Sequence, residues 1–202
     1  MLKIKSKEHI IKSEFIYWYN RNKRILPWRR IFKNKLPNPY YVLVSEFMLQ
    51  QTTVRTVKKK FNEFIKIWPN LKKLSLTNEN NILKFWSGLG YYTRARNLLK
   101  TSKIINKKYN SIIPVKYDDL INLPGIGDYT AKAILGIAFN KPFMPIDANI
   151  ERIISRIYCL KKPINKEKTN IKKIAEKFIT KNHSNKIIQS FMDYGSSICL
   201  PR

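Results

Sequence analysis

Cysteine is almost absent from this chain of 202 residues, which contains two, Cys159 and Cys199. So few thiols argue against the disulfide framework of a small secreted domain and fit a reducing compartment. The two histidines, His9 and His183, do not lie at metal-ligand spacing from each other or from a cysteine. A zinc site built by this chain alone is therefore disfavoured.

Long apolar runs are also missing. The first residues, 1–5, lack the apolar core of a secretory signal. No stretch reaches the roughly 18 consecutive apolar residues that a membrane-spanning helix requires. We therefore expect a cytoplasmic protein with no membrane partner.

Acidic residues are scarce as well. There are 13 Asp and Glu against 40 Lys and Arg, which gives a net charge of +27. Such an excess favours a polyanionic partner. The lysines accompany many Asn and Ile, as in the codon bias of an AT-rich genome, and the basic residues are spread over the whole length. The charge alone therefore does not establish nucleic-acid binding.

The apolar residues recur at helical spacing and no segment alternates with period two, which predicts an all-α fold of about ten helices. Phe15 and Tyr19 lie on one stripe of a first helix. Asn38 and Pro39 start the next, as cap and first helical residue, and its apolar positions run on to Val57. Further helices are expected at 79–86, 91–108, 117–122, 128–139, 149–159, 166–181 and 185–198.

Residues 120–135 predict two short helices joined by a Pro-Gly-Ile-Gly turn. Gly125 and Gly127 would adopt backbone angles barred to other residues and let a DNA strand come close. The amides of the turn, including that of Ile126, would point outward at the start of the second helix, where a phosphate is favoured. This is the pattern of a helix-hairpin-helix motif. A tight corner between helices without a ligand is the alternative, which we consider weaker because the match is long.

Hydrolysis of a glycosidic bond uses two carboxyl groups in opposite states, one protonated and one ionised, so acidic residues in contrasting surroundings are candidates for such a pair. Glu46 lies in the apolar stretch 44–49, where desolvation would raise its pKa and favour the acid form; starting or capping a helix is its alternative role. Asp147 precedes an amphipathic helix. It would serve as the N-cap there, and the helix N-terminus would keep it ionised. Spacing alone does not pair two residues so far apart in the chain.

Several motifs occur in an order that resembles the adenine DNA glycosylases of the MutY type, in the helix-hairpin-helix superfamily. They are Leu-Pro-Trp-Arg at 26–29, Ser-Glu-Phe-Met-Leu-Gln-Gln-Thr at 45–52, Trp-Ser-Gly-Leu-Gly-Tyr-Tyr-Thr-Arg-Ala-Arg-Asn-Leu at 86–98, the hairpin, and Asp-Ala-Asn-Ile-Glu-Arg at 147–152. The resemblance implies the two-lobed glycosylase fold with the DNA cleft between the lobes. One lobe is a six-helix barrel, 31–141, with the hairpin at about 118–137, and the other joins 1–30 to 142–202.

The resemblance also implies a base-excision repair enzyme, a monofunctional glycosylase that hydrolyses the N-glycosidic bond of adenine mispaired with 8-oxoguanine or guanine. Glu46 would protonate the adenine, and Asp147, supported by Asn149, would stabilise the oxocarbenium sugar. Tyr129 stands where lyase-type relatives carry a Schiff-base lysine, which implies hydrolysis by water. A thymine glycosylase acting on G:T mismatches and a catalytically impaired DNA-binding fragment remain as alternatives.

The partner implied is double-stranded DNA with a mismatch, bound by a monomer in a bacterial-type, nucleoid-associated setting. Gln51 and Tyr91 match residues that wedge into the duplex beside the orphan base, although core packing is the alternative for one tyrosine among many. The full set of implied contacts consists of DNA-binding residues Gln51, Thr52, Tyr91, Gly125, Ile126 and Gly127, and base-pocket residues Arg24, Leu26, Trp28 and Gln189.

The resemblance breaks near the end of the chain. The family usually holds a [4Fe–4S] cluster with four cysteines in a C-terminal loop. Cys199 resembles the first of these ligands and three have no counterpart, while Cys159 is expected in the core. The domain that recognises 8-oxoguanine in this family has no counterpart either. We expect a truncated record of a longer enzyme rather than a short protein without the cluster.

Overall fold

The computed structural model describes residues 6–31, 36–179 and 183–201 of the chain. Regular structure in these ranges is helical, apart from an isolated bridge between Ile31 and Pro37, which confirms the all-α prediction. None of the helices in these ranges is long and apolar enough to cross a membrane. The chain divides into two compact units, Ile25–Ile134 and Met1–Arg24 with Leu135–Arg202.

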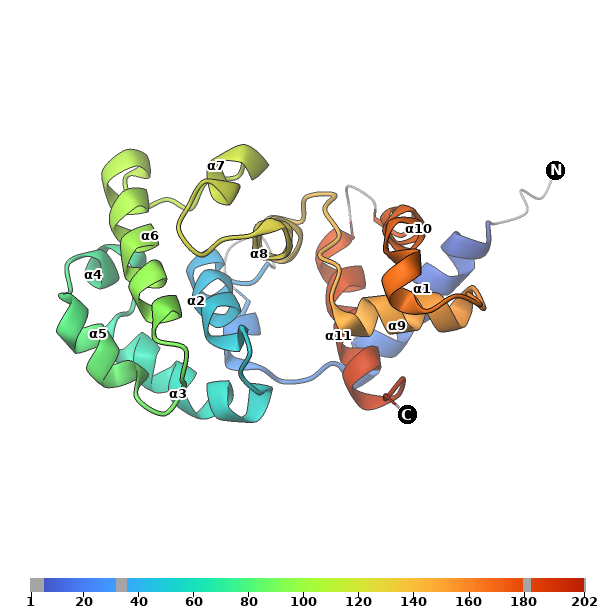
Figure 1. Cartoon of the computed structure of the whole chain (residues 1–202), viewed down its shortest axis with the longest axis horizontal. Helices are drawn as coiled ribbons and strands as arrows, with labels where there is room; N and C mark the ends of the chain where they lie inside the picture. The colour runs from blue at the N-terminus through green and yellow to red at the C-terminus, as the bar shows by residue number, and fades with distance from the viewer. Residues whose placement is uncertain (1–5, 32–35, 180–182, 202) are drawn as a thin grey trace. The chain divides into compact units, whose positions relative to one another are not determined.

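The Ile25–Ile134 unit is a cluster of short helices around α2 (Figure 1). Helix α2 packs against α3, α6 and the 3₁₀ turn η1, and α6 also packs against α4 and α5. Helix α7 packs against α8 to form the hairpin. The elements are η1 (Pro27–Arg29), α2 (Pro39–Leu49), α3 (Val54–Ile67), α4 (Leu71–Ser75), α5 (Glu79–Trp86), α6 (Thr93–Tyr109), α7 (Tyr117–Ile121) and α8 (Asp128–Ala133).

Helix α2 is buried on all its faces, which makes it the centre of this unit. It begins as the sequence predicts: Pro39 is its first residue, and the Asn38 side chain accepts a hydrogen bond from the Tyr40 N–H at 2.9 Å. Every side chain at positions 42–48 is buried. The polar side chains of this stretch, those of Ser45 and Glu46, therefore lie in the interior of the unit.

The prediction of one continuous helix from Pro39 to Val57 is wrong. Helix α2 ends at Leu49 and α3 begins at Val54. Thr53 caps α3 by accepting a hydrogen bond from the Thr56 N–H at 3.3 Å, and Gln51 has a φ of 53°, which no right-handed helix allows. The apolar residues on both sides of the loop keep the spacing of one continuous helix. This spacing therefore does not reveal the loop of four residues between α2 and α3.

The remaining helices lie close to their predicted ranges, with three differences. The helix predicted at 166–181 is α10 (Ile164–Glu176), so residues 177–179 lie beyond its end. Helix α4 was not predicted, since five residues give too short a pattern. The range 128–139 contains α8 and a turn of π-helix, η3 (Ile134–Ala138), rather than one regular helix. Residues 180 and 181, at the end of the range 166–181, lie outside the described residues, as do positions 1–5.

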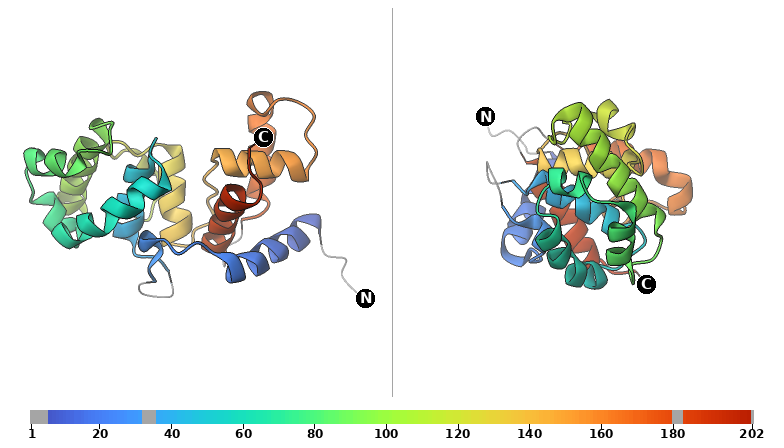
Figure 2. Two further views of the ribbon diagram at one scale, coloured as in Figure 1. Left: turned by 90° about the horizontal axis from the view of Figure 1, so that it is seen from below. Right: turned by 90° about the vertical axis from the view of Figure 1, so that its left-hand side faces the viewer.

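The second unit contains α1 (Lys7–Asn22), α9 (Ala148–Ile157), α10 (Ile164–Glu176) and α11 (Ser184–Ser197). Helix α11 packs against α1 and α9, and α9 packs against α10 (Figure 2). Its core is aromatic. The rings of Phe15 and Phe191 stack with centroids 4.3 Å apart, and Phe178 meets Phe191 edge to face at 5.3 Å.

Replacing Phe191 by alanine should destabilise this second unit strongly. The side chain is fully buried and contacts Phe15 and Phe178, so truncation removes apolar burial and leaves a cavity. We expect a loss of about 3–5 kcal/mol in the free energy of unfolding, measured by urea denaturation. The control Ile10→Ala, at an exposed position of α1, should change it by less than about 0.5 kcal/mol. Equal effects of the two changes would contradict the packing described.

Candidate functional site

Glu46 is a carboxyl group in the middle of the buried helix α2. Its side chain is 8% exposed, and the neighbouring Ser45 and Phe47 are fully buried. It does not cap the helix, because Asn38 performs that function, so the capping role considered from the sequence does not hold. Burial of a carboxyl group costs free energy that a surface position would avoid. Its place in α2 therefore favours a chemical role for Glu46.

Arg94, at the start of α6, is the other charged group in this interior. Every hydrogen bond that it makes among the described residues goes to a backbone carbonyl, and its 7% exposure places the guanidinium inside the unit. Burial lowers the pKa of Arg94 from its ordinary value. We name this arrangement the carbonyl clamp. Its acceptors are Phe47 (3.2 Å) and Met48 (2.7 Å) with Gln50 on Nη1, Leu89 (2.8 Å) and Gly90 (2.9 Å) on Nη2, and Tyr91 (3.4 Å) on Nε.

The carbonyl clamp joins the two loops that carry the predicted wedge residues. Gln51 lies in the loop between α2 and α3, and Tyr91 lies in the turn that precedes α6. Thr52 Oγ1 adds a hydrogen bond to the Leu89 carbonyl at 3.4 Å. Tyr91 is 63% exposed, so the alternative reading of this residue as core packing does not hold. Gln51 is exposed too.

Both wedge candidates have left-handed backbone angles, with φ of 53° for Gln51 and 48° for Tyr91. For a residue with a side chain this conformation costs about 1–2 kcal/mol. Gly88 and Gly90, which shape the turn before Tyr91, have φ of 86° and 69°, where glycine bears no such cost. The two loops are therefore held in strained conformations by contacts elsewhere in the unit.

The hairpin between α7 and α8 is attached to the same core. Thr101 Oγ1, on α6, donates to the Pro124 carbonyl at 2.8 Å, and Gln50 Nε2 donates to the Gly125 carbonyl at 3.2 Å. Gly125 has a φ of 77°, and a Cβ there would lie 2.8 Å from both Asn97 Cβ and the Phe47 ring. The protein's own packing thus already requires glycine at this position.

The other two residues of the turn differ from the sequence expectation in part. Gly127 has a φ of −90°, which any residue can adopt, and open space surrounds the position of a Cβ. The Ile126 side chain is buried, and its N–H donates to the Leu123 carbonyl at 3.1 Å, so this amide does not point outward. Any phosphate contact at this turn would have to use other donors.

Asp147 lies in the second unit as the N-cap of α9, as predicted. Its Oδ1 accepts from the Ile150 N–H at 2.8 Å, and its Oδ2 accepts from Asn149 Nδ2 at 3.0 Å. Burial raises the pKa of Asp147 above its ordinary value of 3.8, although these two donors act in the opposite direction. The N-terminus of α9 thus acts to keep the carboxylate ionised, as expected, but desolvation has the larger effect on its pKa.

Arg152 connects Asn149 to the last described residues of the chain. Its Nη2 donates to Asn149 Oδ1 at 2.8 Å and to the Gly195 carbonyl at 2.6 Å, and its Nε donates to the Cys199 carbonyl at 2.7 Å. A Cβ on Gly195 would lie 2.5 Å from Asn149 Cβ, so glycine permits this close approach of α11 to α9. Because Asn149 Oδ1 is bound by an arginine, its amide nitrogen faces Asp147.

The two cysteines do not fit an iron–sulfur cluster. Cys199 Sγ accepts a hydrogen bond from Arg156 Nη1 at 3.1 Å, and Cys159 is exposed rather than in the core as expected. Four thiolates are needed for a [4Fe–4S] cluster, and this sequence contains two cysteines. Among the described residues, no three His, Cys, Asp or Glu side chains gather closely enough to hold a metal ion.

Two predicted base-pocket residues belong to the second unit. Arg24 is bound to the fully buried Asp193, through its N–H to Oδ2 at 3.0 Å and its Nε to Oδ1 at 2.6 Å. Gln189 precedes Asp193 by one turn of α11, so both face the same side of the helix. Gln189 is buried, and its Oε1 has no hydrogen-bond partner among the described residues.

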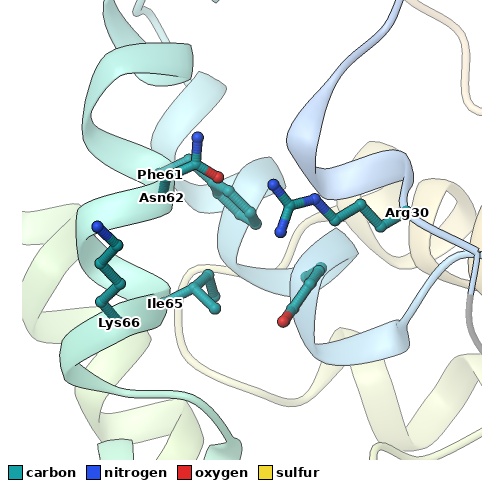
Figure 3. A pocket seen from close by; sticks show the side chains of 6 residues that line it. Arg30, Phe61, Asn62, Ile65 and Lys66 are labelled. Carbon is teal, nitrogen blue, oxygen red and sulfur yellow. The ribbon is translucent and has the colours of Figure 1, made fainter.

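The other predicted residues lie in the Ile25–Ile134 unit. Leu26 and Trp28 are buried around η1, where the Trp28 ring meets the Phe61 ring edge to face at 5.5 Å. Tyr129 is half-buried on α8. A hollow of about 320 Å³ lies near η1, and Figure 3 shows Arg30 extending into it toward α3. None of the predicted site residues lines this hollow, whose lining is Arg30, Tyr41, Phe61, Asn62, Ile65 and Lys66.

Sequence reasoning missed the contacts of Arg94, Arg152 and Asp193, which hold the parts of each unit together. For Arg94 and Asp193 a signal was present, because each is a charged residue at helical spacing within an apolar stripe. Arg94 is followed by buried Leu98 on α6, and Asp193 lies beside buried Phe191 and Met192 on α11. A charge on the buried face of a helix indicates a specific partner.

The sequence pattern of the HhH-GPD superfamily of base excision DNA repair proteins matches residues 44–187. The chain belongs to this superfamily. The adenine DNA glycosylase of Buchnera aphidicola subsp. Baizongia pistaciae is 45% identical over 196 residues, which cover 95% of this chain and 53% of that protein. The Schizosaccharomyces pombe adenine DNA glycosylase is 33% identical over 208 residues, which cover 95% of this chain and 45% of that protein. The chain thus spans about half the length of these relatives.

Solved structures show the same fold. A thermostable thymine-DNA glycosylase matches with a TM-score of 0.83 and 26% identity, over 97% of this chain and 89% of that chain. An endonuclease III trapped in a covalent DNA intermediate matches with a TM-score of 0.77 and 21% identity, over 98% of this chain and 90% of that chain. The predicted all-α glycosylase fold of the helix-hairpin-helix superfamily is therefore confirmed.

Replacing Asp147 by asparagine should stabilise the protein progressively as the pH rises. The folded pKa of Asp147 lies above the unfolded value, so the folded state retains the proton more tightly. The advantage of the carboxyl group over a neutral side chain is complete at pH values below about 4 and is lost as the pH rises through the folded pKa. Asparagine keeps the N-cap bond and avoids the desolvated charge.

The measurement is the free energy of unfolding of wild type and Asp147→Asn in urea, at about pH 3.5 and about pH 7. The variant should gain stability relative to wild type at the higher pH. Glu176→Gln, an exposed position at the end of α10, serves as the control for loss of a surface charge. A difference between variant and wild type that does not change with pH would contradict the raised pKa.

Proposed function

We propose that the chain is the catalytic part of an adenine DNA glycosylase, which removes adenine mispaired with 8-oxoguanine or guanine. The observation that carries this proposal is the carboxyl group of Glu46, buried in helix α2 of a chain that is 45% identical to a curated adenine DNA glycosylase. A buried carboxyl group favours its acid form, and an acid is what a departing base requires.

In the proposed reaction Glu46 donates a proton to a ring nitrogen of adenine. The bond between the base and C1′ of the sugar breaks, the electron pair leaves with the protonated base, and positive charge develops on the sugar. The Asp147 carboxylate stabilises this oxocarbenium ion, as the second carboxylate does in glycoside hydrolysis. Water adds to C1′ and loses a proton, which restores the acid form of Glu46. The products are adenine and an abasic site.

Asn149 and Tyr129 have supporting roles in this proposal. Asn149 donates to Asp147 Oδ2, and it is oriented by Arg152. A hydrogen bond to a carboxylate favours its charged form, which opposes the effect of burial on Asp147. Tyr129 carries no amine and cannot form a Schiff base, so water is the nucleophile and the phosphodiester chain stays intact.

We propose double-stranded DNA with a mismatch as the partner, bound by a monomer. The net charge of +27 favours the polyanion, and the hairpin residues Gly125 and Gly127 border α8, whose N-terminus suits a phosphate. Thr52 supports the loop of Gln51, which together with Tyr91 enters the duplex. The bacterial relatives favour a bacterial cytoplasm with association to the nucleoid.

Gln189 supports recognition of the base. Its buried Oε1 has no partner among the described residues, and leaving such an acceptor unbonded costs free energy. The exocyclic amine of adenine is a donor of the right kind. We propose that Gln189 accepts from this amine, and that Arg24, Leu26 and Trp28 complete the base pocket. No step of this mechanism uses an iron–sulfur cluster, since the residues present do not fit one.

Replacing Glu46 by glutamine should abolish excision and leave DNA affinity nearly unchanged. Glutamine has almost the same shape but has no proton to donate to the base. We expect the single-turnover rate of adenine release from an A:G duplex to fall by roughly 10²–10⁴-fold. Glu63→Gln, at an exposed position of α3, removes the same charge and should keep the wild-type rate. Equal rates for wild type and Glu46→Gln would refute the role of Glu46.

The cleaved product should be an abasic site in an otherwise intact strand. With A:8-oxoguanine and A:G duplexes, strand breaks should appear only after alkali is added, because no amine attacks C1′. Breaks without alkali would contradict the role assigned to Tyr129 and water. A T:G duplex tests the alternative raised by the thymine-DNA glycosylase structure, and faster loss of thymine than of adenine would overturn the choice of adenine.

A further inference from the structure

Two exposed tips of the Ile25–Ile134 unit, Gln51 and Tyr91, share one buried support. The carbonyl of Gln50, directly before the first tip, accepts from Arg94 Nη1, and the carbonyl of Gly90, directly before the second tip, accepts from Nη2 at 2.9 Å. The φ angle of a residue describes how it is turned relative to the peptide group before it. Arg94 therefore binds the two peptide groups against which the left-handed φ angles of Gln51 and Tyr91 are set.

The shape of the guanidinium makes this support rigid. Its N–H groups lie in one plane in a fixed fork, so the directions of the accepting carbonyls are fixed relative to each other. Nη1 serves the end of α2, and Nη2 serves the turn before α6. Trp86 Nε1 adds a hydrogen bond to the Gly90 carbonyl at 3.1 Å. A lysine ammonium is a single point with three donors and cannot reproduce this fork.

The contacts of Arg94 exclude the more ordinary roles of an arginine in a DNA-binding protein. It is buried, so it does not reach a phosphate or a base edge. Its acceptors are carbonyls at the end of α2 and in the two loops, and no ion pair among the described residues includes it. Since burial of a charge is costly, its effect must come from the loops that it holds together.

We propose that Arg94 is a positioning residue for extrusion of the target base. It holds Gln51 and Tyr91 at the backbone angles and the mutual spacing with which both enter the duplex beside the extruded nucleotide. The inference rests on the proposed function, in which these two side chains form the wedge. Arg94 thus acts on DNA through both tips without touching it.

The test separates extrusion from excision by placing 2-aminopurine at the target adenine opposite guanine. This base fluoresces more strongly when it leaves the stack, so the rise in fluorescence on binding reports extrusion. The variants are Arg94→Lys and Arg94→Gln. The control is Leu98→Ala, which removes a fully buried side chain one turn further along α6 and leaves the carbonyl clamp in place. The thermal midpoint and the Kd for DNA are measured alongside.

Wild type should show the fluorescence rise, and both Arg94 variants should lose most of it. Their single-turnover rates of adenine release should fall by about tenfold or more, and their Kd should stay within about threefold of wild type, because the phosphate contacts remain. Leu98→Ala should lower the thermal midpoint and keep the fluorescence rise. Folded Arg94 variants that extrude the base as wild type does would overturn the inference.

A matched pair of glycine variants tests the same point if the Arg94 variants do not fold. Gly88 and Gly90 both have left-handed φ angles and open space at the position of a Cβ, so alanine adds similar backbone strain at either. Arg94 binds the carbonyl of Gly90. Gly90→Ala should therefore reduce the fluorescence rise more than Gly88→Ala. Equal losses would contradict the inference.

The outcome for wild type separates this inference from the proposed function. A wild-type chain that extrudes 2-aminopurine but releases no adenine counts against the proposed function alone. A chain that releases adenine without any fluorescence rise counts against the inference alone, because the tips then contribute nothing to extrusion. If Arg94→Lys keeps the full fluorescence rise and Arg94→Gln loses it, a positive charge at position 94 is sufficient. That result would overturn the role of the planar guanidinium.

Discussion

The burial of charge in two small helical units is the constraint on which the other features of this structure depend. A charged group removed from water must find partners nearby or be neutralised. Arg94 finds six backbone carbonyls, and Asp193 finds the N–H and guanidinium of Arg24. Each of these contacts then determines the course of the chain around it. The conformations of the loops follow from the need to surround buried charge with dipoles.

The two carboxyl groups of the proposed reaction meet this constraint in different ways. Glu46 lies within a helix whose own amides are occupied, among apolar side chains. Asp147 lies at a helix start, where the Ile150 N–H and the Asn149 amide point at it. At Asp147 the two donors favour the charged form, but burial outweighs them and raises the pKa. An acid and a stabiliser require carboxyl groups in different environments, and these two environments differ in the donors that face the carboxyl group.

Much of the helical framework could be predicted from the sequence, because period and caps are local signals. The cap at Asn38 and the range of α5 agree with the structure. The break between α2 and α3 could not be predicted, since the apolar phase continues across it. The hydrogen bonds of Arg94 to Phe47, Met48 and Gln50 could not be predicted either, because these carbonyls lie more than 40 positions away. Burial of Glu46 followed from its apolar neighbours, but the net direction of the pKa shift of Asp147 depended on three-dimensional packing.

The hairpin turn packs so closely against α2 that a Cβ on Gly125 would lie 2.8 Å from the Phe47 ring. Phe47 follows Glu46 in α2, and Gly125 begins the turn that the proposal places against a phosphate. In the proposed mechanism, this close packing sets the separation between the turn that would bind a phosphate and the group that would donate the proton. In a complex bound in this way, the separation would decide which nucleotide, counted from that phosphate, comes within reach of the acid. A side chain larger than hydrogen at position 125 would lengthen the interval and change the count.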